Sequence, residues 1–228
     1  MTQSDSSSNN CSFLPLLRTH CSDIVNVILD DMQIHDHRFS VGDAITHKIP
    51  VPNKPILYRW WFPEDSIVVT KIYDYIEEQK DEELATFLTE KVEKRVCLKD
   101  HKLYYALYFG KSIKGNKRLG QHIKKNIKKT KHLSTVRHTV FGLVYGEYNI
   151  ANKEENERKI DEILQHCYCE WTDICDDANL VVCFESICIA LGNYVLNIEG
   201  NPAISEKWRE KLLDVREKSN IKKKMKNN

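Results

Sequence analysis

With 228 residues, 41% of them hydrophobic and 29% charged, the chain can bury the core of one domain and does not have the composition of a disordered protein. A formal net charge of +1 excludes a uniformly basic or acidic chain. No apolar run approaches the roughly eighteen residues of a membrane span, and the polar start, MTQSDSSSNN, lacks the form of a signal peptide. We therefore expect a cytoplasmic protein without membrane contact.

The N-terminal part of the chain is expected to be mostly helical. Residues 1–10 are polar and rich in Ser and Asn, which predicts a disordered tail. Over 13–32, apolar residues recur at the spacing of a helix that has one apolar side. Residues 39–52 lack this period and are expected to be irregular. We therefore predict a helical extension over 11–49.

The rest of the chain predicts a mixture of strands and helices. Aromatic and β-favouring residues predict strands, and apolar residues at helical spacing predict helices. The expected strands lie at 55–62, at 95–110 with a turn at 99–100, and at 167–172, with a short extended piece at 195–198. The expected helices lie at 64–79, 81–91, 118–129, 134–143, 154–166 and 178–191, with a last helix that begins near 202–205.

This order predicts an α/β (α+β) fold, a small and mostly antiparallel central sheet flanked by helices. We expect one main domain over 50–217, in which 64–102 form a largely helical insert. A basic tail follows over 218–228.

Charge is unevenly distributed along the chain. Residues 111–132 contain nine Lys or Arg and no carboxylate, whereas 64–93 is acidic. A basic block inside a folded domain predicts a polyanionic partner, and we interpret this block as a nucleic-acid contact. The alternative is a solvated surface face.

The eight cysteines are scattered and form no CxxC pair. A zinc site among them is therefore only a weak alternative, because zinc ligands usually come in closely spaced pairs. Reduced and mostly buried thiols in a cytosolic protein fit the pattern better.

The segment 107–122, LYFGKSIKGNKRLGQH, is a candidate active site. A strand carries Tyr108 to Gly110, and Arg118 and His122 then lie four residues apart on one face of a helix. A phenol can exchange a proton and a guanidinium can bind phosphate oxygens. This combination suits phosphate chemistry. Strand alternation predicts that Tyr104 lies on the same side as Tyr108.

Glu185 is the one acid in the apolar run VVCFESICIALG. Burying an unpaired carboxylate is costly, so this residue needs a partner. A buried hydrogen bond or a side chain that reaches water would meet that need. A divalent cation such as Mg²⁺ is the sharper hypothesis, because it takes oxygen ligands and often only one or two carboxylates.

Several short motifs occur in order along the chain and together resemble the GIY-YIG nuclease superfamily over about 50–217. Tyr108-Phe109-Gly110 resembles the second tyrosine motif, and Ile56-Leu57-Tyr58 resembles the first. The other matching positions are Lys111, Ser112, Arg118, His122, the STVRHT segment (134–139), Glu185 and Asn197.

The resemblance implies a metal-dependent DNA endonuclease, possible relatives being restriction or defence enzymes, with Mg²⁺ or Mn²⁺ as cofactor. It implies that Tyr58, helped by Tyr108, takes a proton from the attacking water, and that Glu185 binds the metal. Arg118 would neutralise charge on the phosphate, and His122 would orient water or substrate. The implied substrate-binding residues are Lys111, Ser112, Lys117, Ser134, Arg137, His138 and Asn197. For Ser134, Arg137 and His138 the alternative is that they only cap and pack a helix.

Two features leave alternatives open. Ile56 replaces the glycine of the first motif, which would fit a catalytically inactive nucleic-acid-binding protein. A second placement of the first strand, at 95–97, would lack the tyrosine. A third interpretation is a protein-interaction module that docks through the acidic segment 64–93.

For the nuclease, double-stranded DNA is the expected partner. Cutting both strands would favour a homodimer with matching twofold symmetry.

Overall fold

The computed structural model describes residues 13–34, 38–47, 49–123, 135–147 and 152–219. In chain order its elements are α1 (Phe13–Ile34), β1 (Arg38–Ser40), α2 (Val41–Thr46), β2 (Ile56–Pro63), α3 (Ile67–Gln79), α4 (Glu82–Thr86), the π-helical turn η2 (Phe87–Lys91), β3 (Lys94–Val96), β4 (Leu103–Ser112), α5 (Gly115–Ile123), α6 (Thr135–Tyr145), α7 (Lys153–Leu164), β5 (Tyr168–Thr172), α8 (Ala178–Leu191) and α9 (Glu206–Lys218).

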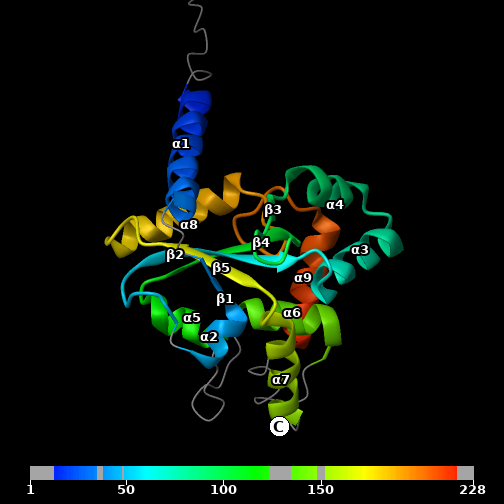
Figure 1. The fold of residues 1–228 in the computed structure, drawn as a ribbon. Helices are drawn as coiled ribbons and strands as arrows, with labels where there is room; N and C mark the ends of the chain where they lie inside the picture. Colours follow the sequence, from blue (N-terminus) through cyan, green and yellow to red (C-terminus); the bar gives the residue numbers. More distant parts are fainter. Residues whose placement is uncertain (1–12, 35–37, 48, 124–134, 148–151, 220–228) are drawn as a thin grey trace, which may run out of the picture.

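A five-stranded sheet in the order β1-β5-β2-β4-β3 lies at the centre, and every neighbouring pair in it is antiparallel. Helices α1 and α8 cover one face, while α2, α5 and α6 pack on the other (Figure 1). The predicted fold class, a small antiparallel sheet flanked by helices, is therefore confirmed. None of the described helices is long and apolar enough to cross a membrane.

The two central strands, β2 and β4, carry the aromatic residues that make them strands. All eight residues of β2 are buried, because both faces of this strand are covered. Tyr58 and Trp60 face the larger core, and Leu57 and Trp61 face the smaller core beneath α1 and α8. The predicted strand at 55–62 is thus a central strand, which explains its continuous apolar run.

A β-bulge interrupts the pairing of β2 with β4. Trp60 lies opposite Tyr108, but the next residue, Trp61, lies opposite Ala106. Leu107 is therefore the extra residue on β4, and such a residue shifts the alternation of the side chains that follow it.

This bulge contradicts the prediction that Tyr104 and Tyr108 share one side of the strand. Tyr105, Leu107 and Tyr108 all belong to the larger core, whereas Tyr104 belongs to the smaller one. The period-two rule fails here because the extra residue reverses it between the two tyrosines.

The segment before β2 is more structured than the sequence predicts. Helix α1 agrees with the predicted helix at 13–32. However, β1 and α2 lie within 38–46, much of which was expected to be irregular. Strand β1 pairs with β5, Phe39 lying opposite Cys169. The extension is therefore not purely helical, because it supplies an edge strand of the sheet. The predicted tail at 1–10 lies outside the described residues.

The insert between the two tyrosine motifs leaves their strands adjacent. Elements α3, α4, η2 and β3 lie within 64–102, and β3 pairs with β4 only at Leu103–Tyr105, far from Gly110 along the strand. The segment 195–198 was expected to be extended and forms no strand. Instead, the Leu196 amide donates to the Leu107 carbonyl at 2.8 Å, which pairs the free edge of β4 at the bulge.

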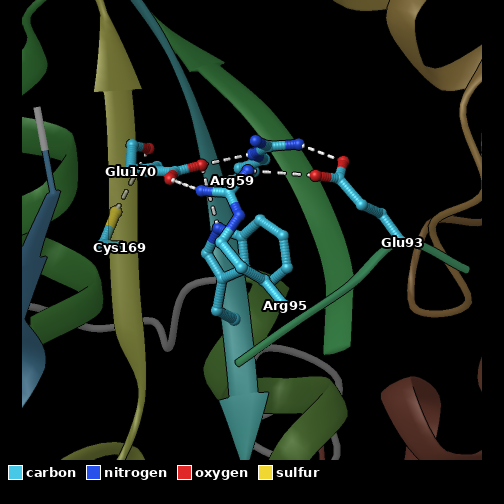
Figure 2. A network of polar contacts seen from close by, with 6 residues as sticks. Arg59, Glu93, Arg95, Cys169 and Glu170 are labelled. Atoms are coloured by element: carbon cyan, nitrogen blue, oxygen red, sulfur yellow. Dashed lines mark hydrogen bonds and ion pairs between the residues drawn. The ribbon is translucent and has the colours of Figure 1, made fainter. Parts of the chain in front are cut away.

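A buried network of charges ties three strands together on the face covered by α1 and α8 (Figure 2). Arg59 is fully buried and donates through Nε to Glu170 and through Nη1 to Glu93, each at 2.5 Å. Arg95 bonds the same two carboxylates at 2.6 and 3.0 Å. The Trp61 indole lies within 4.6 Å of both guanidinium carbons. Two cations thus face two anions, and the charges balance.

Candidate active site

A cleft of about 360 Å³ opens at the end of β4, where α5, α8, α9 and the loop after α8 meet. Most of its lining side chains are polar or charged. They are Tyr108, Lys111, Arg118, Thr135, Glu185, Ser186, Ile189, Asn197, Ile198, Glu199, Gly200 and Arg216. Residues predicted from distant parts of the sequence therefore share one cleft, notably Tyr108 and Glu185.

A larger cavity, of about 470 Å³, lies at the other end of the sheet beside Pro63 and Tyr104. It is lined by acidic residues, such as Asp65 and Asp100, and by none of the predicted site residues. The side chains that suit phosphate chemistry therefore line the smaller cavity and not the larger one.

Gly110 allows the two phenols to approach one another. It lies opposite Tyr58 on the neighbouring strand. A methyl group at Gly110 would lie 2.8 Å from the Tyr58 hydroxyl oxygen and 3.1 Å from Cε1 of Tyr108. Because carbon atoms do not approach other heavy atoms so closely, only glycine fits this position without displacing a tyrosine ring.

Tyr58 lies behind the cleft and is hydrogen-bonded to a histidine. Its hydroxyl group is 2.8 Å from Nε2 of His122, and both side chains are buried. The His122 ring also packs edge-on against Trp60, with the ring centroids 5.9 Å apart. His122 therefore does not reach the open cleft, and the predicted role of orienting water or substrate does not fit its position.

Burial sets the protonation of this pair. Loss of water raises the pKa of Tyr58 well above 10, an effect that the nearby Arg118 partly opposes. Burial lowers the pKa of His122 well below 6.5, and the charges of Arg118 and Arg137 lower it further. At neutral pH the phenol is therefore protonated and the imidazole is neutral, so Nε2 can accept the phenolic proton in a hydrogen bond.

Asn197 is hydrogen-bonded to the backbone of β4 between Tyr108 and Gly110. Its Oδ1 accepts from the Phe109 amide at 2.8 Å, and its Nδ2 donates to the Phe109 carbonyl at 2.9 Å. The side chain thus replaces a neighbouring strand where β3 no longer covers β4. This contact fixes Tyr108 and Gly110, which flank Phe109.

Glu185 reaches the cleft from α8, where it lies one turn from the buried residues Val181 and Ile189. Its Oε2 is bonded by the Lys111 ammonium group. The lone acid of the apolar helix therefore has a cationic partner, and that partner comes from the strand end beside Gly110.

The donor groups fit a hard divalent cation better than zinc. Among the described residues, no three His, Cys, Asp or Glu side chains gather to hold a metal. A single carboxylate is nevertheless sufficient for Mg²⁺ or Mn²⁺ when water and substrate phosphate supply the other ligands. The Lys111 ammonium bonded to Glu185 shows that this carboxylate already accepts positive charge in the cleft. The cysteines for which a zinc site was considered do not form one in the described part of the chain.

The N-terminal half of the basic segment borders the cleft. Arg118 lines both the cleft and an adjoining shallow hollow, where Lys117 also lies. Ser112 is buried, and its hydroxyl accepts from the Lys114 amide at 3.0 Å, which shapes the turn into α5. The lysines beyond Ile123 lie outside the described residues, as does Ser134.

Two of the predicted substrate-binding residues have structural partners instead. Arg137 is fully buried, forms ion pairs with Glu157 at 2.8 Å and Asp161 at 2.7 Å, and donates to the His122 carbonyl. It therefore holds the backbone at His122 and does not line the cleft. His138 lies 3.3 Å from the Ser219 hydroxyl, at the contact of α6 with the end of α9.

Arg216 is a cleft residue that the sequence did not reveal. It comes from α9, whose many charged residues gave no reason to select one of them. Burial raises the pKa of Tyr108, and Arg216 is the strongest opposing influence, followed by Arg118. Only the packing of α9 against α6 brings this side chain to the phenol.

The small antiparallel sheet brings a phenol, a guanidinium and a carboxylate to one cleft. A family model described as the GIY-YIG catalytic domain matches residues 56–218. Because the match covers well over half of the chain, the protein belongs to this family. Comparisons with curated proteins and with solved structures gave no significant match.

The match begins at Ile56, the first residue of β2, which favours β2 over 95–97 as the strand of the first motif. Ile56 is fully buried, and a methyl group at Gly115 would lie only 2.9 Å from its Cδ1. Ile56 stands where the resemblance expects the glycine of the first motif, and Gly115 in α5 leaves room for the larger side chain. Ile56 is not among the residues that line the cleft.

Proposed function

We propose that the protein is a metal-dependent endonuclease that hydrolyses phosphodiester bonds of double-stranded DNA, in a restriction or defence role. The observation that carries the proposal is the shared cleft of Tyr108, Arg118 and Glu185, with Tyr58 behind Gly110. A proton acceptor, a phosphate-binding cation and a carboxylate are the groups that phosphodiester hydrolysis requires.

The first step is removal of a proton from the attacking water. A free tyrosine has a pKa near 10 and is a poor base at neutral pH. The bond from the Tyr58 hydroxyl to His122 offers a route, in which the phenol passes its own proton to Nε2 while it accepts one from water. Burial, which lowers the pKa of His122, opposes this transfer. Tyr58 then never has to exist as a free phenolate.

Substrate binding favours this proton transfer. Without DNA, burial disfavours a protonated His122, and the charges of Arg118 and Arg137 disfavour it further. A phosphate bound by Arg118 offsets one of those charges and so lowers the cost of the imidazolium. His122 therefore acts through Tyr58, as a positioning and proton-accepting residue.

The remaining residues bind and position the phosphate. Arg118 places its guanidinium where charge builds up on the phosphoryl oxygens. Glu185 would hold Mg²⁺ or Mn²⁺, and the cation would supply charge stabilisation at the leaving 3′ oxygen. Lys111, which is paired with Glu185 here, would contact phosphate if a cation took its place on that carboxylate. Lys117 is exposed beside Arg118 and suits a sequence-independent backbone contact.

The test is incubation of the purified chain with plasmid and phage DNA in Mg²⁺ or Mn²⁺. We expect cleavage by the unaltered protein, a loss of at least about 10³-fold in Glu185→Ala, and a loss of about 10²-fold in Tyr108→Phe. Glu210→Gln, a change to an exposed acid of α9 that does not line the cleft, is the control and should cleave normally. Full activity of Glu185→Ala would remove the metal assignment.

A non-catalytic nucleic-acid-binding protein is the competing function. Its best support was the missing glycine at Ile56, and that residue lies in the core outside the cleft lining. Binding of DNA without cleavage in either metal, over several duplex and branched substrates, would favour this alternative.

A further inference from the structure

Arg216 differs from the buried arginines of the molecule in the partners of its guanidinium group. Arg59 and Arg137 are each bonded to two carboxylates. Arg216 is half-buried, and within the described residues no carboxylate lies within 4.0 Å of it. Among the described residues no carboxylate therefore bonds it directly. Burial lowers its pKa, and the more distant charge of Glu199 opposes this effect only in part.

Neutral acceptors hold the Arg216 guanidinium in one orientation. Its Nε donates to Thr139 Oγ1 at 2.7 Å, and its Nη2 donates to the Leu196 carbonyl at 2.7 Å. The Thr139 hydroxyl donates its own proton to the Thr135 carbonyl at 2.9 Å, so its lone pair is directed to Arg216. Two of the three nitrogens are thus fixed by α6 and by the loop before α9.

The held guanidinium borders the same cleft as Tyr108 and Arg118. A partly desolvated cation without a counter-ion is costly, and a bound anion relieves that cost. The guanidinium fork matches phosphate oxygens, and the cleft already contains the groups that cleave a phosphodiester. The anion that this arrangement suits is a phosphate of the substrate strand.

We propose that Arg216 is a second phosphate-binding residue of the active site, which holds a backbone phosphate of the bound strand together with Arg118. The inference rests on the proposed nuclease function and adds a binding residue to it. Thr139 is the positioning residue, because it fixes the direction of the guanidinium without reaching substrate through its own hydroxyl.

The first measurement is the salt dependence of duplex DNA binding by the full chain, without divalent metal. Loss of one phosphate contact lowers the slope of log K against log salt by about 0.9. We expect this change in Arg216→Gln, together with a roughly 10- to 100-fold weaker affinity. Lys218→Gln removes the same charge from an exposed site two residues away and should leave the slope unchanged. An unchanged slope in Arg216→Gln would overturn the proposal.

The second measurement separates positioning from charge, using Thr139→Val and Thr139→Ser. Thr139→Val removes the acceptor of Arg216 Nε and keeps the charge, so we expect the salt slope to stay and the single-turnover cleavage rate to fall about 10-fold. Thr139→Ser retains the hydroxyl and should restore the rate. If Arg216→Gln does not fold, this pair decides the matter, since equal rates for the two Thr139 variants would overturn the proposal.

The two proposals fail in different ways. If the unaltered protein cleaves DNA and Arg216→Gln matches it in rate and slope, the Arg216 assignment is wrong and the nuclease function stands. If the unaltered protein binds DNA without cleaving it, the nuclease function is wrong, while the difference in slope between Arg216→Gln and Lys218→Gln still decides whether Arg216 binds phosphate.

Discussion

The buried network around Arg59 and the cleft around Tyr108 use similar residue types in opposite ways. In the network, Arg59 and Arg95 face Glu93 and Glu170, and every carboxylate oxygen in Figure 2 is bonded. In the cleft, Lys111, Arg118 and Arg216 are close to Glu185 and to the rim residue Glu199, and only Lys111 has an ion pair among the described residues.

This difference separates structural charges from functional ones. In the network each cation is paired with two carboxylates, so we expect its contribution to be to the fold. An open cleft with an excess of cations is stable only because water reaches it, and it gains from a polyanion. Mutations in the network are therefore expected to change the free energy of unfolding, and mutations in the cleft to change the cleavage rate.

The largest effect expected in the cleft comes from Tyr58→Phe. The substitution keeps the ring in the core and removes the hydroxyl bonded to His122. We expect cleavage to fall by about 10²- to 10⁴-fold because the proton acceptor is lost, while the free energy of unfolding changes by only about 1 kcal/mol. Single-turnover cleavage and urea denaturation measure the two effects. Normal cleavage by this variant would exclude Tyr58 as the base.

In the network, Glu170→Gln should lower the stability of the fold and leave the cleavage rate almost unchanged. It leaves two guanidinium groups with one fewer buried anion. We expect the free energy of unfolding to drop by about 3–5 kcal/mol, while cleavage per folded molecule stays close to normal. Urea denaturation, with activity measured at a temperature where the variant is folded, tests this. A loss of cleavage in fully folded protein would break the proposed separation of the two sites.

Gly110→Ala should lower both the stability and the cleavage rate, each by a smaller amount. The new methyl group would lie 2.8 Å from the Tyr58 oxygen and would push both phenols apart. We expect a loss of stability of about 1–3 kcal/mol and a cleavage rate lower by at least about 10-fold. Gly120→Ala is the matched control, because its nearest neighbour would be 3.7 Å away, and it should stabilise α5 by up to about 1 kcal/mol.

The smallest expected effect is a pH dependence that arises from His122. Burial lowers its pKa in the folded state below the ordinary 6.5, so the unfolded chain binds the proton more readily. The stability that comes from the neutral ring is complete above about pH 6.5 and is lost as the pH falls below it, by up to about 1.4 kcal/mol per pH unit. Urea denaturation between pH 7.5 and 5.5 measures this, and His122→Gln should have a shallower dependence. Parallel curves for the two proteins would contradict the assignment.

Local patterns in the sequence predicted most elements of the fold. The aromatic run of β2 and the helical period of α1 predicted their elements to within a few residues. Strand β1 was missed because it has only three residues and is stable through its pairing with β5. The bulge at Leu107 was also missed, since nothing in a run of aromatic residues marks which one is unpaired.

The candidate site divides in the same way. Tyr58, Tyr108, Arg118 and Glu185 could be predicted because each stands in a short motif or a contrasting environment. Arg137 was assigned to substrate because it stands in the STVRHT segment of the resemblance, whereas the carboxylates that neutralise it lie twenty or more residues away. Arg216 could not be chosen among the cations of α9 until the packing showed which one borders the cleft.

The sequence by itself determined which residues are able to do the chemistry, because residue type and local period depend only on neighbours along the chain. The tertiary structure decided which of them meet. It placed a carboxylate of α8 and guanidinium groups of α5 and α9 beside one phenol, and it enclosed Arg137 with its acidic partners. That division has a physical reason: a side chain's charge and hydrogen-bonding groups are fixed by its identity, whereas their use depends on partners that only the folded chain brings together.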